Sequence, residues 1–193
     1  MTIQTILQRA TEFLKSNGIE EARLDAEVLL AHLLKMRRLY LYVHLELNLV
    51  EEDINDYKEL LHRRAERVPV AQLTGNKEFM GLDFIITPDV LIPRPETEIL
   101  VQMSIEILGP IKTPITIADI GTGSGAIAVS MLHYLDNVTA DAVDISQAAL
   151  DVAKSNAEKF DVDNRINLFN GDLLKPLHDK KYDAILCNPP YIP

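Results

Sequence analysis

The chain has 193 residues, enough for one large or two small domains, and a hydrophobic share of 47% is typical of a globular core. The single cysteine excludes an internal disulfide, and the five histidines lack the close pairing of a metal site, so we expect no bound metal. A formal charge of −10 disfavours binding to an extended nucleic-acid backbone. No apolar run approaches the length of a membrane span and the first residues do not resemble a signal peptide, so we expect a cytoplasmic location.

The first third of the chain carries the spacing of amphipathic helices. Thr2 can cap a first helix, and Gly18 can close it in a left-handed conformation. The apolar run 39–43 fits either a strand or a buried helix, and its neighbours favour a helix. We therefore predict a small helical bundle for residues 1–68, whose two basic groups lie at solvated helix ends rather than in a docking patch. The predicted helices cover residues 3–17, 21–35, 39–43 and 51–67.

The pattern changes at residue 69. Residues 70–74 and 82–87 resemble short extended runs, separated by turn residues at positions 75–76 and 80–81. We therefore predict a β-hairpin linker for residues 69–90.

Strands and helices alternate through residues 91–193. Such alternation predicts parallel strands with helical crossovers, so we expect a doubly wound α/β domain. The predicted strands are 115–120, 138–143, 165–169 and 182–187, and the predicted helices are 95–108, 125–135 and 146–160.

A glycine-rich segment follows the first of these strands. Residues 119–125 read Asp-Ile-Gly-Thr-Gly-Ser-Gly, where a strand turns into a helix, so backbone N–H groups are exposed and a ligand can approach the chain closely. A tight turn that merely needs glycine is the weaker alternative. Gly121, Gly123 and Ala126 also fit the dinucleotide fingerprint, so the segment predicts a nucleotide-type cofactor and leaves NAD open.

Two aspartates follow the next two strands. Asp144 can accept hydrogen bonds from the hydroxyls of an adenosine ribose, or it can open the turn before Ser146. Asp172 can face an adenine amino group or simply make a turn, and the sequence does not separate these two roles.

The segment Asn188-Pro189-Pro190-Tyr191 follows the last predicted strand. The lone pair of an amide nitrogen is delocalised, so its methylation requires a site that binds the N–H hydrogens and directs the nitrogen. The Asn188 side-chain oxygen and the Pro189 carbonyl can accept those hydrogens, and Tyr191 can lie against a flat substrate group. A proline-rich loop with Tyr191 as packing is the alternative. We expect Cys187, which has apolar neighbours, to lie in the core.

These motifs together resemble the HemK/PrmC family of N5-glutamine methyltransferases, which modify the glutamine of the Gly-Gly-Gln motif in peptide chain release factors. The resemblance spans the chain. It is carried by Arg63-Arg64 before Pro69, by 75–79 with Gly81-Leu82, and by 90–98, 119–126, 142–146 and 188–191.

The resemblance implies a Rossmann-like class I methyltransferase domain in residues 91–193 that uses S-adenosyl-L-methionine. The helical domain, residues 1–68, would dock the release factor. The implied catalytic residues are Asn188, Pro189, Pro190 and Tyr191. The implied cofactor-binding residues are Asp119, Gly121, Thr122, Gly123, Gly125, Asp144, Asp172 and Asn188. The implied substrate entrance consists of Arg94, Pro95, Glu96 and Thr97.

Family members continue past the Asn-Pro-Pro-Tyr motif, so we expect the domain to be incomplete at its C-terminus. The 193-residue chain would then be a fragment or truncated product that binds cofactor weakly, associates through the strand 182–187 and has little or no activity.

Other functions stay open from the sequence. Asn-Pro-Pro-Tyr also occurs in ribosomal-protein glutamine methyltransferases and adenine-N6 DNA methyltransferases, although the segment 92–98 is typical of the release-factor enzymes. An NAD-dependent oxidoreductase could use the same glycine loop and Asp144. A non-catalytic binding module is the remaining alternative.

Overall fold

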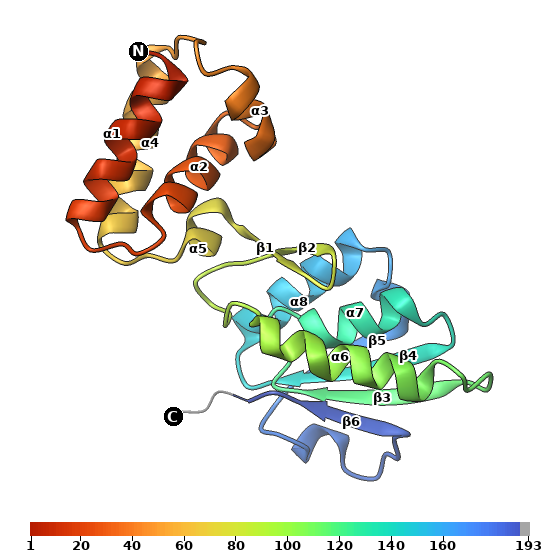
Figure 1. The fold of residues 1–193 in the computed structure, drawn as a ribbon. Helices are drawn as coiled ribbons and strands as arrows, with labels where there is room; N and C mark the ends of the chain where they lie inside the picture. The colour runs from red at the N-terminus through yellow and green to blue at the C-terminus, as the bar shows by residue number, and fades with distance from the viewer. Residues whose placement is uncertain (190–193) are drawn as a thin grey trace. The chain divides into compact units, whose positions relative to one another are not determined.

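A computed structural model describes residues 1–189 of the chain. The chain forms two compact units, Met1–Gly75 and Asn76–Pro193 (Figure 1). No helix within residues 1–189 is both long enough and apolar enough to cross a membrane.

The first unit is a helical bundle. Thr2 caps the first helix, because its Oγ1 accepts a hydrogen bond from the Thr5 amide over 3.3 Å, and Gly18 follows this helix with a φ of 71°. The run 39–43 is helical, and Leu41 lies buried in the core, which confirms that prediction. The helices are α1 (Ile3–Ser16), α2 (Ala22–Leu33), α3 (Arg38–Val43), α4 (Glu51–Ala65) and α5 (Val70–Thr74).

Two arginines of the basic group 63–67 stabilise this bundle from within. Arg64 Nε lies 2.7 Å from Asp25 Oδ2, and both side chains are largely buried. Arg67 donates to the carbonyls of Asn17 and Gly18 at the end of α1. These two guanidinium groups therefore satisfy groups of the bundle itself, and Arg64 is largely buried in an ion pair rather than solvated at a helix end as the sequence predicted.

The prediction of an extended run at 70–74 is wrong, because these residues form the short helix α5. Pro69 has a φ of −61° and extended ψ, which suits the residue before a helix, and Gly75 closes the helix with a φ of 72°. The helix also places Leu73 in the core of the bundle. Tertiary burial therefore overrides the weak extended propensity of this segment.

The β-hairpin lies after this helix, in strands β1 (Asn76–Phe79) and β2 (Leu82–Ile85), which pair antiparallel. Met80 and Gly81 both have positive φ, as the tight turn of a two-residue hairpin requires. Phe79 and Phe84 are buried in the core of the second unit with ring centroids 6.0 Å apart. The hairpin is therefore packed onto the second unit rather than forming a free linker.

The rest of the second unit confirms the predicted α/β alternation. Its strands are β3 (Ile115–Ile120), β4 (Val138–Asp144), β5 (Ile166–Asn170) and β6 (Ala184–Cys187), and its helices are α6 (Pro95–Leu108), α7 (Ala126–Tyr134) and α8 (Gln147–Lys159). The strands are parallel in the order β5-β4-β3-β6. Short 3-10 turns occupy Asp163–Arg165 and Lys175–Leu177.

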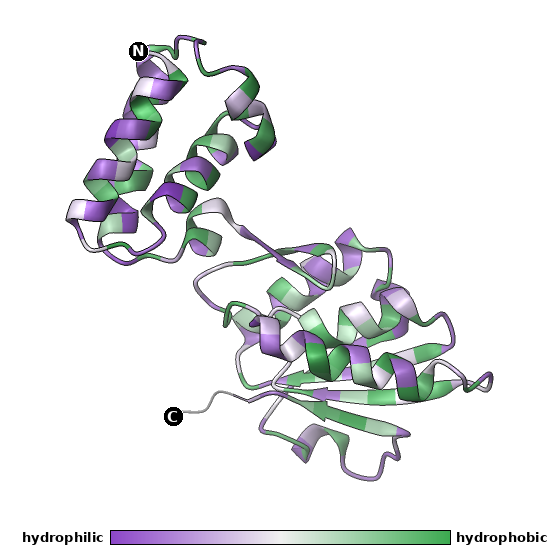
Figure 2. Ribbon diagram, viewed as in Figure 1, coloured by the Kyte–Doolittle hydropathy of each residue, from purple (hydrophilic) through white to green (hydrophobic). Residues whose placement is uncertain are grey.

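Alternate residues of β3 supply two cores. Ile115 and Ile117 pack with α7 and α8 in the larger cluster on one face of the sheet, whereas Ala118 and Ile120 pack with Leu177 on the other face. Because both faces are covered, β3 is largely apolar along its length, as Figure 2 shows by its mainly green colour.

Asp141 in β4 ties the segment before β6 to the sheet. It accepts hydrogen bonds from Asn167, from Lys180 Nζ at 2.7 Å and from the Tyr182 hydroxyl at 2.7 Å. Burial alone would raise the pKa of the Asp141 carboxyl, but these hydrogen bonds keep its pKa below the ordinary value. The ionised carboxylate therefore fixes the approach to β6, the strand that leads to Asn188.

Candidate functional site

A cavity of about 320 Å³ lies where β3, β4 and β6 end. Ligands of open α/β sheets bind at this carboxyl edge, and the volume lies in the range of roughly 300–1,000 Å³ that ligand clefts occupy. The cavity is lined by Asp89, Val90, Leu91, Ile120, Gly121, Gly123, Val143, Asp144, Ile145, Ser146, Ala149, Gly171, Asp172, Leu173, Cys187, Asn188 and Pro189.

Two glycines expose the backbone to this cavity. A Cβ atom built on Gly121 or on Gly123 would meet no other atom within 4 Å, and both residues have positive φ. A Cβ on Gly125, by contrast, would lie 3.2 Å from the Cβ of Ala153. Gly121 and Gly123 therefore form an open wall, whereas Gly125 allows α7 to pack closely against α8.

The backbone amides of the glycine loop are used within the fold. Gly121 and Thr122 donate to the carbonyl of Val143 at 2.9 and 3.0 Å, and Gly123 donates to Asp144 Oδ2 at 2.9 Å. The sequence predicted exposed N–H groups here. In the structure these three amides join β3 to β4, so they are not arranged as a cradle for phosphate.

Asp119 lies beneath the loop and is fully buried. Its Oδ2 accepts hydrogen bonds from the Thr122 hydroxyl at 2.7 Å and from the Ala128 amide at 3.2 Å, whereas its Oδ1 has no hydrogen-bond partner. Burial, opposed in part by these hydrogen bonds, raises the pKa of Asp119 to about 6. Asp119 does not line the cavity, so direct contact with a cofactor stays a prediction.

Asp144 lies at the cavity, at the end of β4. Its two carboxylate oxygens accept hydrogen bonds from Gly123 and from the Ser146 amide at 3.0 Å. The large apolar side chains of Ile145 and Leu173 line the same cavity and are mostly exposed. These two side chains provide apolar surface on which a ligand ring can pack, next to the oriented carboxylate of Asp144.

Asp172 also lines the cavity, and its side chain is half exposed. Its Oδ2 lies 2.6 Å from Lys175 Nζ. The two roles considered for Asp172 from the sequence, contact with an adenine and turn formation, both stay open.

Asn188 joins this cavity to a second one of about 50 Å³. The two cavities share Leu91, Gly121, Gly123 and Asn188. Asn188 Nδ2 donates to Thr97 Oγ1 over 2.6 Å. The side chain that the sequence assigned to substrate binding is thus placed at the junction.

The predicted entrance residues divide into two groups. Arg94 and Thr97 line the small cavity. Pro95 and Glu96 begin α6, are exposed and do not line either cavity. Pro189 lines the larger cavity, and Pro190 and Tyr191 lie outside the described residues.

The prediction that Cys187 lies in the core is wrong, because this residue is exposed and lines the cavity. Strand alternation directs Leu186 toward the core and Cys187 to the opposite face of β6, which is exposed at Ile185 as well. Partial burial, and then the charge of Asp119, raise the pKa of the Cys187 thiol, so the neutral thiol prevails near pH 7.

Asn156, which the sequence did not single out, is fully buried in α8. Its Nδ2 donates to the carbonyls of Ser124 and Ile85, and its Oδ1 accepts from the Ile85 amide at 2.7 Å. This side chain therefore joins the hairpin to the glycine loop. A polar residue among the apolar positions of the predicted helix was the only sign of this role in the sequence.

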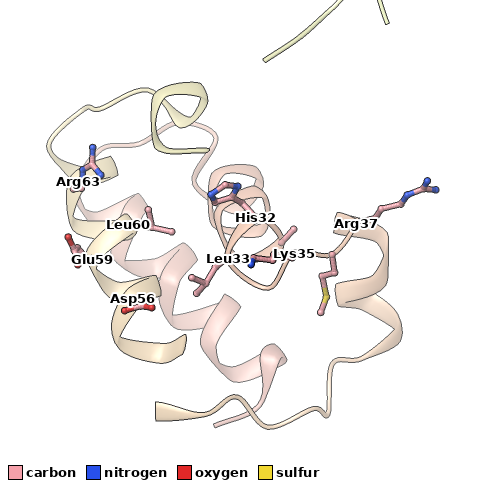
Figure 3. A pocket seen from close by; sticks show the side chains of 10 residues that line it. His32, Leu33, Lys35, Arg37, Asp56, Glu59, Leu60 and Arg63 are labelled. Atoms are coloured by element: carbon pink, nitrogen blue, oxygen red, sulfur yellow. The ribbon is translucent and has the colours of Figure 1, made fainter. Parts of the chain in front are cut away.

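A larger cavity, of about 740 Å³, lies in the helical unit between α2 and α4 (Figure 3). It contains none of the predicted cofactor or catalytic residues. Leu33 and Leu60 supply apolar surface, and charged side chains of both signs surround them, including Lys35, Arg63 and Glu59. Within residues 1–189, no group of three or more His, Cys, Asp or Glu side chains is arranged to bind a metal.

Comparison with known proteins covers both units. The family model described as "PrmC N-terminal domain" matches residues 5–75, and the one described as "Methyltransferase small domain" matches residues 97–192. A release factor glutamine methyltransferase from Moorella thermoacetica is 46% identical over 193 residues, which cover 100% of this chain and 68% of the relative. One from Rhodopirellula baltica is 43% identical over 198 residues, covering 99% and 66%. The chain thus spans about two thirds of the length of these relatives.

A solved structure supports the fold of the second unit. A SAM-dependent methyltransferase from Agrobacterium tumefaciens superposes with a TM-score of 0.50 at 18% identity, covering 59% of this chain and 39% of that one. At this identity the likeness concerns the fold alone.

Proposed function

The chain belongs to the release factor glutamine methyltransferase family, and on this premise we propose that it methylates a release factor. The methyl group passes from S-adenosyl-L-methionine to the side-chain amide nitrogen of the glutamine in the Gly-Gly-Gln motif. The reaction takes place in the cytoplasm, as expected from the sequence.

The observation that favours S-adenosyl-L-methionine over a dinucleotide is that Asp119, near the end of β3, and neighbouring loop groups already bind backbone amides that could otherwise bind phosphate. Asp119 accepts a hydrogen bond from the Ala128 amide in the first turn of α7, where a dinucleotide would place its pyrophosphate. The loop amides of Gly121, Thr122 and Gly123 are also engaged within the fold. The carboxylate of Asp119 beneath the loop also disfavours a phosphate group at this helix N-terminus, whereas Asp144 can accept the ribose hydroxyls of either cofactor.

The site residues suit the remaining parts of S-adenosyl-L-methionine. Asp144 is oriented by two backbone amides, and each of its oxygens retains a lone pair that can accept a ribose hydroxyl. Ile145 and Leu173 offer apolar surface for the adenine ring. Gly121 and Gly123 leave room for the cofactor to lie against the backbone.

Asn188 and Pro189 bind the substrate amide in this proposal. When bound, S-adenosyl-L-methionine supplies an electrophilic methyl group on its sulfonium. Asn188 Oδ1 and the Pro189 carbonyl accept the two hydrogens of the glutamine amide and direct its nitrogen at the methyl carbon. Transfer of this methyl group to the amide nitrogen would release the cofactor as a neutral thioether, and the surplus proton on nitrogen would pass to water. Positioning, rather than a strong base, supplies most of the rate enhancement.

The helical unit Met1–Gly75 recognises the release factor in this proposal. Its helix α3 exposes Leu39, Tyr40 and Val43, and exposed apolar clusters of this kind often mark protein interaction sites. Replacing Leu39 and Val43 together by Ser should raise KM for the release factor about tenfold while leaving KM for a short glutamine peptide unchanged. An equal change for both substrates would contradict this role of α3.

The function itself is tested on the full-length protein. Calorimetry should show binding of S-adenosylhomocysteine and no binding of NAD. Mass spectrometry should then locate one added methyl group on the glutamine of the Gly-Gly-Gln motif of a purified release factor. Binding of NAD alone would establish the oxidoreductase alternative. Methyl incorporation into DNA or ribosomal protein, with none into release factor, would establish one of the other methyltransferase alternatives.

A further inference from the structure

Thr97 and Asn188 are 91 residues apart in sequence and are joined by a hydrogen bond of 2.6 Å between Asn188 Nδ2 and Thr97 Oγ1. Thr97 is only 8% exposed. Both residues line the small cavity, and only Asn188 of the two also lines the larger one. The contact therefore lies directly behind the side chain that we assign to the substrate amide.

The orientation of the Asn188 amide decides whether it can serve as an acceptor. A rotation of 180° about the last side-chain bond exchanges the carbonyl oxygen for the NH2 group, which can only donate. The two hydrogens of a substrate amide would then face two other hydrogens. A bond from Nδ2 to Thr97 directs the NH2 group toward α6 and so directs Oδ1 the opposite way.

We propose that Thr97 is a positioning residue that fixes the Asn188 amide with its Oδ1 toward the substrate nitrogen. The inference rests on the proposed function, because only a substrate with N–H hydrogens needs this orientation.

The surroundings of Thr97 suit this role because they hold its hydroxyl in place. Thr97 lies in the first turn of α6, which Pro95 begins, and its own amide donates to the Arg94 carbonyl at 3.0 Å. Val101, one turn later, is fully buried and anchors the helix in the core. A group that orients a functional side chain from a rigid element acts with little entropic loss.

The test compares two substitutions of Thr97 with a control in the same helix. Thr97→Val keeps the shape and removes the acceptor, whereas Thr97→Ser keeps the hydroxyl. Ser104→Ala removes another buried hydroxyl of α6, one that donates to the Leu100 carbonyl and does not contact Asn188. We expect Thr97→Val to lower kcat for release-factor methylation at least tenfold, with the Kd for S-adenosylhomocysteine within about twofold of the wild type. Thr97→Ser should retain at least a third of kcat, and Ser104→Ala should leave kcat unchanged.

A double-mutant cycle separates positioning from a general structural effect. In an Asn188→Ala background, Thr97→Val should produce no further loss of kcat, because the group that it positions is absent. Additive losses, an unchanged kcat in Thr97→Val, or failure of Thr97→Ser to restore activity would each overturn the proposal.

A spectroscopic measurement keeps this inference distinct from the proposed function. The side-chain amide protons of Asn188 should exchange slowly with water in the wild type and at least tenfold faster in Thr97→Val. If the wild type does not methylate the release factor but shows this difference in exchange, the contact stands and the proposed function fails. If the two exchange rates are equal, the positioning role fails whatever the activity.

Discussion

The amide of Gly123 donates to the carboxylate of Asp144 over 2.9 Å, which joins the loop after β3 to the end of β4. The second carboxylate oxygen is held by the amide of Ser146. The carboxylate is thus oriented before any ligand arrives, and hydrogen bonds to a charged acceptor of this kind are stronger than those between neutral groups. Cofactor binding and loop conformation should therefore depend on the same side chain.

Replacement of Asp144 should weaken cofactor binding strongly. Asp144→Ala removes the acceptor for both amides and for the ribose, and each hydrogen bond to a charged group contributes about 1.5–3 kcal/mol. We expect the Kd for S-adenosylhomocysteine to rise about 100-fold or more, measured by calorimetry. Asp144→Asn keeps one oxygen and should show a smaller loss. Asp151→Asn, a neutralised carboxylate on the exposed side of α8, is the control and should bind normally. Equal Kd values for Asp144→Ala and the wild type would rule out the assigned role.

Asn188→Ala should separate catalysis from cofactor binding. The substitution removes one of the two acceptors assigned to the substrate amide, so the glutamine nitrogen is no longer directed at the methyl carbon. We expect kcat to fall about 100-fold while the Kd for S-adenosylhomocysteine changes less than about threefold. Steady-state kinetics with a release factor and calorimetry together measure this difference. An unchanged methylation rate would remove Asn188 from the substrate site.

The central strands β3 and β4 were predictable from the sequence because most of their residues are buried on both faces of the sheet. The β-branched run 115–120 is strand β3 with the same bounds, and Ser146, at the start of the predicted helix 146–160, caps α8. The glycine loop, Asp144 and Asn188 were also placed correctly at the carboxyl edge, because parallel strands bring their ends together.

The remaining features depend on contacts between distant segments. The helix α5 forms because Leu73 is buried in the bundle, a tertiary effect that a five-residue pattern does not contain. The exposure of Cys187 follows from which face of β6 the neighbouring elements leave uncovered. The use of the loop amides by Val143 and Asp144 depends on the pairing of β3 with β4. None of these three features can be predicted from a local sequence pattern.

Asn156→Ala should destabilise the second unit. The substitution leaves the partly buried amide and carbonyl of Ile85 and the buried carbonyl of Ser124 without their side-chain partner. Each buried group left unsatisfied costs about 1–3 kcal/mol, so we expect a loss of about 2–4 kcal/mol in the free energy of unfolding. Denaturant unfolding of the full-length protein, followed by circular dichroism, measures this loss.

The neighbouring residue provides a matched control for Asn156. Ser155 is exposed on the same helix, and its hydroxyl donates only to the Asp151 carbonyl one turn earlier. Ser155→Ala should change the free energy of unfolding by less than about 0.5 kcal/mol. If Asn156→Ala were as stable as Ser155→Ala, the buried amide would not be joining the hairpin to the loop.

Asp119 should make stability fall as pH rises. Its pKa in the folded protein is about 6, raised by burial above the ordinary 3.8, so the folded state binds more protons than the unfolded state between these two values. Stability therefore decreases with increasing pH across this window, since the ionised carboxylate is disfavoured in the buried site. The difference between the two pKa values corresponds to about 3 kcal/mol of stability. This stability is present at low pH and is lost as the pH rises through the folded-state pKa of about 6.

Asp119→Asn isolates this contribution, because an amide oxygen can still accept from Thr122 and Ala128 but does not ionise. The free energy of unfolding of the variant minus that of the wild type should increase by about 2–3 kcal/mol between pH 4 and pH 7. Urea unfolding at several pH values measures this difference, and other titrating groups cancel because both proteins share them. Asp151→Asn controls for the loss of one exposed carboxylate. A difference between Asp119→Asn and the wild type that stays constant with pH would show that Asp119 is ionised throughout this range in the folded protein.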